Sequence, residues 1–419
     1  MLILIDSLIK HMKYHFGLFK ILIGLQLFFS LTSQAQKIYI DENIAYWNDI
    51  NNELQVNHNI FFEDEIAHIY LEIALNAGMN IDQYHMIYEL HESYHTLSIQ
   101  KSDTIDIAQH IIKTNGNHIY CKFELPNNDK IDLVVFKLVN KKTGIDYVYD
   151  IPCIEDYNFS TDGLILYNED GVTPYLKSFI SKGTPVQIKS INDYSRPIFV
   201  YYYAQQFDEA VPPMVIEDNR AAKQLVIDST FIIPLNQVFT PINEGLYFFQ
   251  KDSSSAKGIG IRVQDKYFPL VKSFDKILDP LIYISTRSET DEIRNANDKQ
   301  AAFENYWINL VKVPAVASAA VRKFYERVEG ANYLFTNFEE GWKSDMGMIY
   351  IIYGPPDDVY KSEEIIDWVY NRDLTMPVVR FSFYKVKNVF SPDHYTLLRK
   401  KNYEKNWFKS VELWRDGKK

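Results

Sequence analysis

Hydrophobic and polar residues alternate along much of the chain between residues 37 and 152. One clear run, residues 66–73 (IAHIYLEI), is followed by a polar turn at residues 76–80 (NAGMN). Similar runs occupy residues 84–90, 117–125, 131–139 and 147–151. A period of two residues is typical of strands with one buried face. Short strands separated by polar turns predict an antiparallel β-sandwich over residues 36–154.

The same pattern continues over residues 155–287, with polar turns such as residues 168–171 (NEDG). The expected strands are residues 163–167, 185–191, 197–204, 225–234, 245–250 and 258–263. We therefore predict a second β-sandwich-like domain. Two of these runs, 199–203 (FVYYY) and 245–249 (GLYFF), place aromatic residues on both faces of a strand. We interpret them as core, with one face able to meet another domain or a partner.

Helical periodicity replaces the alternation from about Ser288 onward. Two sets of apolar residues recur at helical spacing: Phe303, Trp307, Leu310 and Val311, then Val321, Phe324, Tyr325 and Val328. Pro314 between them predicts a break between two helices. Short strands are expected at residues 349–353, 368–370 and 378–386. Residues 288–419 are thus predicted to form an α+β domain, the third part of a mainly β, multidomain chain.

Residues 1–35 have the layout of a signal peptide. Lys13 and Lys20 flank the start of an apolar run at 21–31 (ILIGLQLFFSL), and a small-x-small site (SQA) follows at 33–35. The run is shorter than the ~18 residues a membrane-spanning helix needs. No cysteine follows it that could carry a lipoprotein anchor. We expect an exported protein, periplasmic or outer-membrane-associated, without a transmembrane segment after signal cleavage.

Composition narrows the class of partner. The 419 residues carry a formal net charge of −11 and no basic run, which argues against nucleic acid and anionic membrane surfaces as partners. Cys121 and Cys153 both fall in the first predicted domain, where export permits a disulfide, but two buried thiols are equally compatible. The sequence also leaves open the start codon (Met1 or Met12), the oligomeric state and the identity of any partner.

Residues 91–95 (HESYH) match the H-E-x-x-H pattern of zinc hydrolases. The pattern requires a helix, which places both histidines on one zinc ion. Apolar spacing here permits a helix, but the preceding turn and the tyrosines favour a strand. In a strand His91 and His95 would lie about 13 Å apart, too far to share a metal. No third-ligand motif follows, so we predict no metal site and interpret the match as chance.

Residues 341–357 (GWKSDMGMIYIIYGPPD) form the most distinctive motif. Glycines around an indole supply flexible or positive-φ positions, and Ser344 or Asp345 can hydrogen-bond the backbone of the same turn. The following strand is expected to end at the consecutive prolines. The candidate binding and family-motif residues are Gly341, Trp342, Asp345, Gly347, Tyr353, Gly354, Pro355, Pro356 and Asp357.

This motif resembles the GWxTD domain family, found in exported proteins of Bacteroidota. Ser344 replaces the name-giving threonine, and Met346 stands where the family often has arginine. The preceding helix, residues 324–335, and the aromatic tail around Trp407 and Trp414 are also similar, so the resemblance covers about residues 295–419. The resemblance implies membership of a family, but it does not imply a known activity. We expect the tail, residues 395–414, to dock on a partner.

Asp345, Asp357 and Asp358 are the candidate acid/base group, against the simpler interpretation that they cap turns. No phosphate-binding loop or nucleophile elbow is present in the sequence. We therefore predict no catalytic residue and no cofactor. The chain is expected to be a non-catalytic interaction or scaffold component of the cell envelope, in outer-membrane protein assembly or a secretion or gliding apparatus, with other envelope proteins as partners. The alternative is an envelope hydrolase or glycan-binding enzyme that uses the acidic residues of the motif.

Overall fold

The computed structural model describes residues 43–63, 66–94, 99–126, 132–153, 161–216, 225–372 and 377–419. All of them belong to one compact unit, residues 40–419. The predicted signal peptide and His95 of the HESYH pattern lie outside the described residues. Within the described ranges no helix is both long and apolar enough to cross a membrane.

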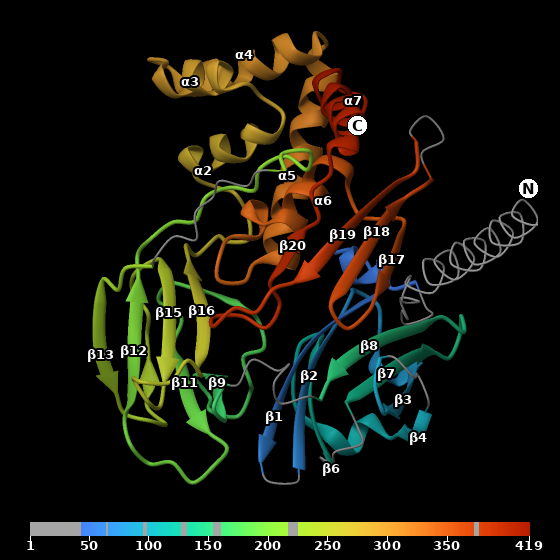
Figure 1. The fold of residues 1–419 in the computed structure, drawn as a ribbon, viewed down its shortest axis with the longest axis vertical. Coiled ribbons are helices and arrows are strands. Elements are labelled where there is room, and N and C mark those ends of the chain that lie inside the picture. Colours follow the sequence, from blue (N-terminus) through green and yellow to red (C-terminus); the bar gives the residue numbers. More distant parts are fainter. Residues whose placement is uncertain are drawn as a thin grey trace, which may run out of the picture. The chain divides into compact units, whose positions relative to one another are not determined.

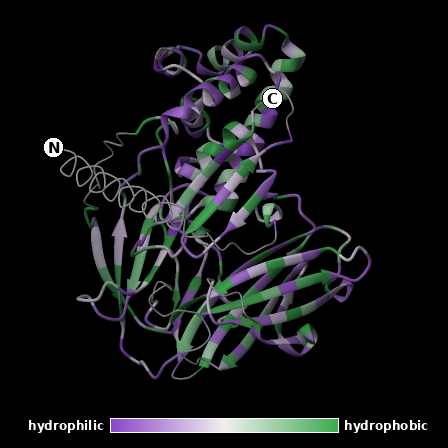
Figure 2. Cartoon of the chain, turned by 45° about the vertical axis from the view of Figure 1, so that its right-hand side comes forward, coloured by the Kyte–Doolittle hydropathy of each residue, from purple (hydrophilic) through white to green (hydrophobic). Residues whose placement is uncertain are grey.

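Two four-stranded antiparallel sheets form the N-terminal sandwich (Figure 1). The first has the order β1-β2-β6-β5 and the second β4-β3-β7-β8. The strands are β1 (Leu54–Glu63), β2 (Ile66–Leu75), β3 (Tyr84–His91), β4 (Ile99–Ile105), β5 (Ile111–Asn115), β6 (His118–Pro126), β7 (Leu133–Asn140) and β8 (Asp146–Pro152). Short 3-10 turns precede β3 (Ile81–Gln83) and β5 (Ile107–His110). Figure 2 shows hydrophobic and hydrophilic residues interleaved along these strands, as the alternation predicted.

The HESYH segment is a strand up to His91. β3 pairs with β4 and β7, and residues 92–94 are not helical. The His91 ring is buried, with Nε2 3.2 Å from a carboxylate oxygen of Glu89. The strand predicted at residues 84–90 is confirmed and ends at His91, and the described part of the pattern, residues 91–94, does not form the helix that a zinc hydrolase needs. The described residues contain no group of three or more potential metal-ligating side chains.

Both cysteines are free thiols buried in the core of the N-terminal sandwich. Cys121 lies on β6, and Cys153 directly follows β8. Burial raises the pKa of each thiol to about 12. Of the two possibilities left open by the sequence, the structure has the pair of buried thiols.

Since the reactive form of cysteine is the thiolate, neither thiol should react in the folded protein. We expect no labelling by a maleimide at pH 8 in buffer and labelling of both residues in denaturant. Mass spectrometry of the intact chain counts the added groups. A native protein that resists labelling even after unfolding, and gains two reactive thiols only on reduction, would contradict this expectation.

The second β-sandwich contains a five-stranded sheet, β10-β16-β15-β12-β13, and a three-stranded sheet, β14-β11-β9. Its strands are β9 (Leu164–Asn168), β10 (Phe179–Ser181), β11 (Val186–Ser190), β12 (Ile198–Tyr203), β13 (Ser229–Ile233), β14 (Val238–Phe239), β15 (Gly245–Gln250) and β16 (Ile259–Gln264). Every pairing is antiparallel except that of β10 with β16. The two sheets share one core, which includes Leu166, Val200 and Phe249.

The aromatic run of β15 is buried on both faces, as predicted, and that of β12 is buried or partly buried along its length. Tyr247 and Phe249 point into the sandwich core. Tyr203 and Phe248 point the other way and contact Phe338, which follows α5, and Phe390, which lies between β19 and β20. The outer face of the sheet is thus covered by the chain's own C-terminal part.

The C-terminal part combines helices with an antiparallel sheet of order β17-β18-β19-β20 (Figure 1). Its helical elements are α2 (Phe274–Leu278), η4 (Asp279–Tyr283), α3 (Arg287–Asn295), α4 (Lys299–Val311), α5 (Pro314–Phe335), η5 (Gly341–Lys343), α6 (Asp345–Tyr353), η6 (Lys401–Tyr403) and α7 (Glu404–Arg415). Its strands are β17 (Asp358–Lys361), β18 (Ile365–Tyr370), β19 (Val379–Lys385) and β20 (Tyr395–Leu397). Pro314 opens α5, so the predicted helix break is confirmed. The mainly β class with a C-terminal α+β domain is confirmed as well.

The strand predicted at residues 349–353 is wrong, because these residues form the second half of helix α6. Ile349, Ile351 and Ile352 are fully buried, and so are their neighbours. A helix that is apolar on all sides shows no 3.6-residue period, and a short apolar run cannot then be told from a buried strand.

The tail that is expected to dock on a partner has several of its aromatic residues in the core of its own domain, and docking itself stays a prediction. Trp407, Trp414 and Tyr403 fill the core of their own domain, and Trp414 packs edge-on against Phe324 of α5 at 5.5 Å between ring centroids. Phe408, by contrast, is 55% exposed. Helix α7 is therefore a structural part of the domain.

Helix α3 is tied to α7 through one ion pair. Thr286 and Glu289 form a capping box at the start of α3, and Arg415 Nη2 donates to Glu289 at 2.7 Å. The Arg415 guanidinium holds the pKa of Glu289 at about 2, although partial burial acts in the opposite direction.

A carboxyl group with a depressed pKa stabilises the fold above its unfolded pKa and loses that contribution as the pH falls. Glu289→Gln should therefore lower the free energy of unfolding by about 1 kcal/mol at pH 7. The difference from wild type should shrink as the pH falls from 4.5 toward 2. Denaturant titrations at several pH values measure it, with exposed Glu292→Gln as control. A difference independent of pH would contradict the assignment.

Residues 43–48 cover the edges of two sheets. The Ile44 N–H donates to the Val359 carbonyl (3.1 Å), and Asn43 Oδ1 accepts from the Val359 N–H (2.9 Å), which occupies the edge of β17. In the adjoining 3-10 turn η1 (Ala45–Asn48), Tyr46 and Trp47 donate to the Val148 carbonyl on β8. Such covered edges are protected from pairing with other chains.

Candidate functional site

Two glycines of the motif mark points where backbone packs directly on backbone. A Cβ at Gly341 would clash with the Ala331 carbonyl of α5, and a Cβ at Gly347 would clash with the Gly341 carbonyl. Each added Cβ would lie much closer to the carbonyl oxygen than 3.0 Å, a distance below which real Cβ atoms are essentially never found. Helix α5, turn η5 and helix α6 are thus stacked without space for any side chain at these positions.

Side chains around the motif satisfy its backbone groups. Thr336 Oγ1 accepts from the Gly341 N–H (2.9 Å), and Asn332 Oδ1 accepts from the Trp342 N–H (3.1 Å). Ser344 caps α6: its Oγ accepts from the Gly347 N–H (3.0 Å) and donates to the Gly341 carbonyl (2.7 Å). Threonine can make the same two bonds, so the exchange of Thr for Ser keeps the chemistry of the motif.

Asp345 is the first residue of α6 and is 5% exposed. Its Oδ2 accepts from the Leu397 N–H on β20 (2.8 Å) and from Arg399 Nη1 (3.1 Å). Arg399 also reaches the Val211 carbonyl, in the segment after β12, at 3.3 Å. The carboxylate is therefore committed to an ion pair and to holding β20 against α6.

Asp357 and Asp358 lie beyond the other end of α6, which is about 13.5 Å long at its rise per residue. Asp357 Oδ2 accepts from the N–H groups of Asn371 (2.7 Å) and Arg372 (2.8 Å). Asp358 accepts from the side chains of Asn43 and Asn371. The structure therefore does not bring Asp345 and Asp357 together, and both accept backbone N–H groups.

The remaining motif residues shape the ends of α6. Trp342 is 7% exposed, and its carbonyl accepts from the Tyr283 hydroxyl at 3.0 Å. Tyr353 packs on Phe381 at 5.0 Å between ring centroids. Gly354, at φ +93°, ends the helix in a backbone conformation that favours glycine, and Pro355 and Pro356 follow. These residues position the helix and the elements around it.

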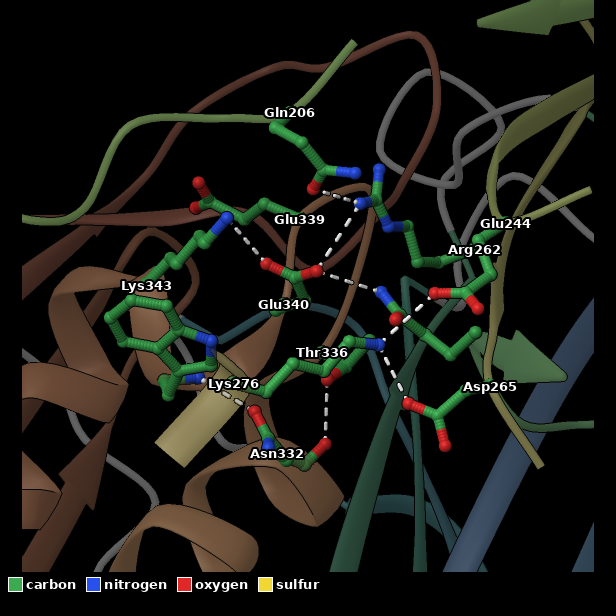
Figure 3. A network of polar contacts seen from close by, with 12 residues as sticks. Gln206, Glu244, Arg262, Asp265, Lys276, Asn332, Thr336, Glu339, Glu340 and Lys343 are labelled. Carbon is green, nitrogen blue, oxygen red and sulfur yellow. Dashed lines mark hydrogen bonds and ion pairs between the residues drawn. The ribbon is translucent and has the colours of Figure 1, made fainter. Parts of the chain in front are cut away.

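A buried polar network lies beside the motif and was not predicted from the sequence (Figure 3). Glu340 lies 2.6 Å from Lys343 Nζ and 3.4 Å from Arg262 Nη2, and it accepts from Gln264 Nε2 at 3.1 Å. Arg262 is 1% exposed and also donates to Gln206 (2.8 Å). Burial alone would raise the pKa of Glu340, but the charges of Lys343 and Arg262 hold it below its ordinary value.

This network connects strand β16 of the second sandwich to the motif. A signal was present in the sequence: Arg262 stands inside an apolar strand (IRV), and a buried charge needs a partner. The partner could not be named, because Glu340 lies far along the chain and is only one of many acidic residues.

Fold and site together define a multidomain, β-rich protein whose C-terminal α+β domain is built around a glycine–tryptophan turn. Residues 245–416 match the family model of the GWxTD domain, so this chain carries a GWxTD domain and the resemblance is confirmed. The match begins at β15, earlier than the motif alone suggested, and so includes Arg262 of β16. A search of curated proteins found no match to the chain.

Proposed function

We propose that this protein is a non-catalytic interaction or scaffold component of a bacterial cell envelope, exported to the periplasm or the outer membrane. Outer-membrane protein assembly or a secretion or gliding apparatus of Bacteroidota is the setting we propose. One observation carries the proposal: the polar groups of the GWxTD motif are used within the fold. Asp345 is paired with Arg399, Asp357 accepts two backbone N–H groups, and the glycines pack on backbone.

A second feature supports a fixed arrangement of this chain's own domains, which a scaffold needs. Lys361 of the GWxTD domain lies 2.7 Å from Asp150 of the N-terminal sandwich, and Asp150 is fully buried. The hydroxyl of Tyr94 also donates to Asp150. A buried ion pair with a further donor fixes the geometry between two elements, because removing one partner leaves an uncompensated charge.

Affinity purification of the tagged protein from its native envelope tests the proposal. We expect a stoichiometric protein partner, and we expect the same partner with Asp357→Asn, which keeps an acceptor for the two N–H groups but removes the ionisable carboxyl. Failure to recover any partner after mild cross-linking would contradict a scaffold role. Loss of cellular function in Asp357→Asn with unchanged partner recovery would favour a hydrolase instead.

A further inference from the structure

A cavity of about 410 Å³ lies where the N-terminal sandwich, the second sandwich and the GWxTD domain meet. It is lined by β1 (residues 55–61), by residues 258–261 at the start of β16, by the end of α5 and by residues 390–393. Ligand sites of 300–1,000 Å³ are preferentially found at such domain interfaces. The volume suits a short segment of chain or a small ligand.

Strand β1 presents its unpaired edge to this cavity. β1 is the terminal strand of its sheet. The Ile60 N–H donates to Asn59 Oδ1 (2.9 Å), and the Leu54 carbonyl accepts from Asn52 Nδ2 (2.8 Å). In an antiparallel ladder the N–H and C=O groups of one residue point to the same side. The backbone N–H and C=O groups of the even-numbered residues of β1 therefore point away from β2. Val56 and His58 lie between Leu54 and Ile60 on this edge, and both line the cavity.

The N–H and C=O groups of Val56 and His58 on this edge have no partner among the residues that the structure describes. Unpaired groups in a row are a template for a further strand. An extended peptide that adds to such an edge gains main-chain hydrogen bonds, while pockets beside the edge select its side chains. The other edges described above, those of β8 and β17, are covered by residues 43–48.

The charges that line the cavity favour an acid. Lys177, Lys361 and Lys385 line it together with His58, against one carboxylate, Asp393. Lys361 is already neutralised by Asp150. The His58 ring has no hydrogen-bond partner in the described ranges. The excess of basic residues around the cavity contrasts with the net charge of the whole chain, which is −11.

Burial is the main cause of the pKa shifts of His58 and Lys385. Burial lowers the pKa of His58, and the charges of Lys361 and Lys385 lower it further, while Asp393 and Asp150 act against them. Burial likewise lowers the pKa of Lys385, and Lys361 adds to the effect against the same two carboxylates. An additional negative charge beside His58 and Lys385 would favour their protonated forms.

We propose that this cavity binds an extended acidic peptide, which adds as a strand to the β1 edge at Val56 and His58 and directs a carboxylate toward His58 and Lys385. The proposal rests on the scaffold function above and deepens it by specifying the element of the partner that is recognised.

A labelled, blocked peptide, acetyl-Thr-Val-Glu-Val-Thr-amide, titrated into the full chain and followed by fluorescence anisotropy, tests the proposal. Its Gln analogue, in which the single Glu is replaced, should bind at least tenfold more weakly. Lys385→Glu should weaken binding of the Glu peptide at least tenfold, whereas exposed Lys387→Glu should change it less than twofold. Binding should tighten from pH 8 to pH 6, because protonated His58 favours the carboxylate, and His58→Gln should remove this pH dependence while leaving the protein folded.

Hydrogen exchange distinguishes strand addition from simple ion binding. The bound peptide should slow exchange of the Val56 and His58 amides, and inorganic phosphate should not. No binding of the peptide at millimolar concentration, equal binding of the Gln analogue, or full competition by phosphate would each overturn the proposal. If the peptide fails to bind but the envelope purification recovers a partner, the scaffold function stands and only this site is refuted.

Discussion

Gly347→Ala should lower the free energy of unfolding of the GWxTD domain by more than about 3 kcal/mol, a large effect for one methyl group. The added Cβ would meet the Gly341 carbonyl, which is backbone and cannot rotate away. Alanine is normally favoured over glycine inside a helix by about 1 kcal/mol, so propensity alone predicts the opposite sign. Denaturant unfolding followed by tryptophan fluorescence measures the change.

Gly330→Ala in helix α5 is the matched control. There the Cβ would approach the Tyr350 ring at 3.1 Å, and a side chain can shift by a few tenths of an ångström. We expect a change within about 1 kcal/mol of wild type. If Gly347→Ala were as stable as Gly330→Ala, the close stacking of α6 on η5 would be refuted.

Arg399→Gln should destabilise the protein by about 3–5 kcal/mol, because it leaves the Asp345 carboxylate buried without its cation. The two side chains are only 6% and 4% exposed, so water can compensate little of the loss. Thermal and denaturant unfolding at pH 7 measure the difference.

Another arginine–aspartate pair of the same motif provides the comparison. Arg372 lies 3.7 Å from Asp357 but is 75% exposed, and exposed ion pairs contribute about 0–1 kcal/mol. Arg372→Gln should therefore remain within that range. Similar losses from Arg399→Gln and Arg372→Gln would mean that the Asp345–Arg399 pair does not hold α6 against β20.

The strands of both sandwiches could be predicted from the sequence because each is a short apolar run bounded by polar turns. Val200 and Phe249, for example, enter the core of the second sandwich from strands with clear apolar runs. Helix α6 could not be predicted, since it is buried on every side and its isoleucines favour strands locally. The packing of η5 against α5 determines its conformation, and that packing is not a property of the local sequence.

For the candidate site, too, the local sequence predicted some features and only the fold determined the others. The motif could be recognised in the sequence, because glycine, tryptophan and a Ser-Asp pair at close spacing serve the local needs of a turn and a helix start. Its partners, Arg399, Asn332 and Arg262, come from other elements and are fixed only by the fold. For the same reason the junction cavity, which joins β1 with β16 and residues 390–393, has no signature in the sequence.

We infer that Asp345, the carboxylate of the motif, has a structural role and no catalytic one. The double variant Asp345→Asn/Arg399→Gln tests it most directly, because a neutral amide pair keeps an acceptor for the Leu397 N–H and leaves no buried charge. Stability and recovery of envelope partners are measured for the double variant beside each single variant. We predict that the double variant is more stable than either single variant and recovers partners as wild type does. A stable double variant that binds its partners but fails to support cellular function would contradict the account and assign Asp345 a chemical role.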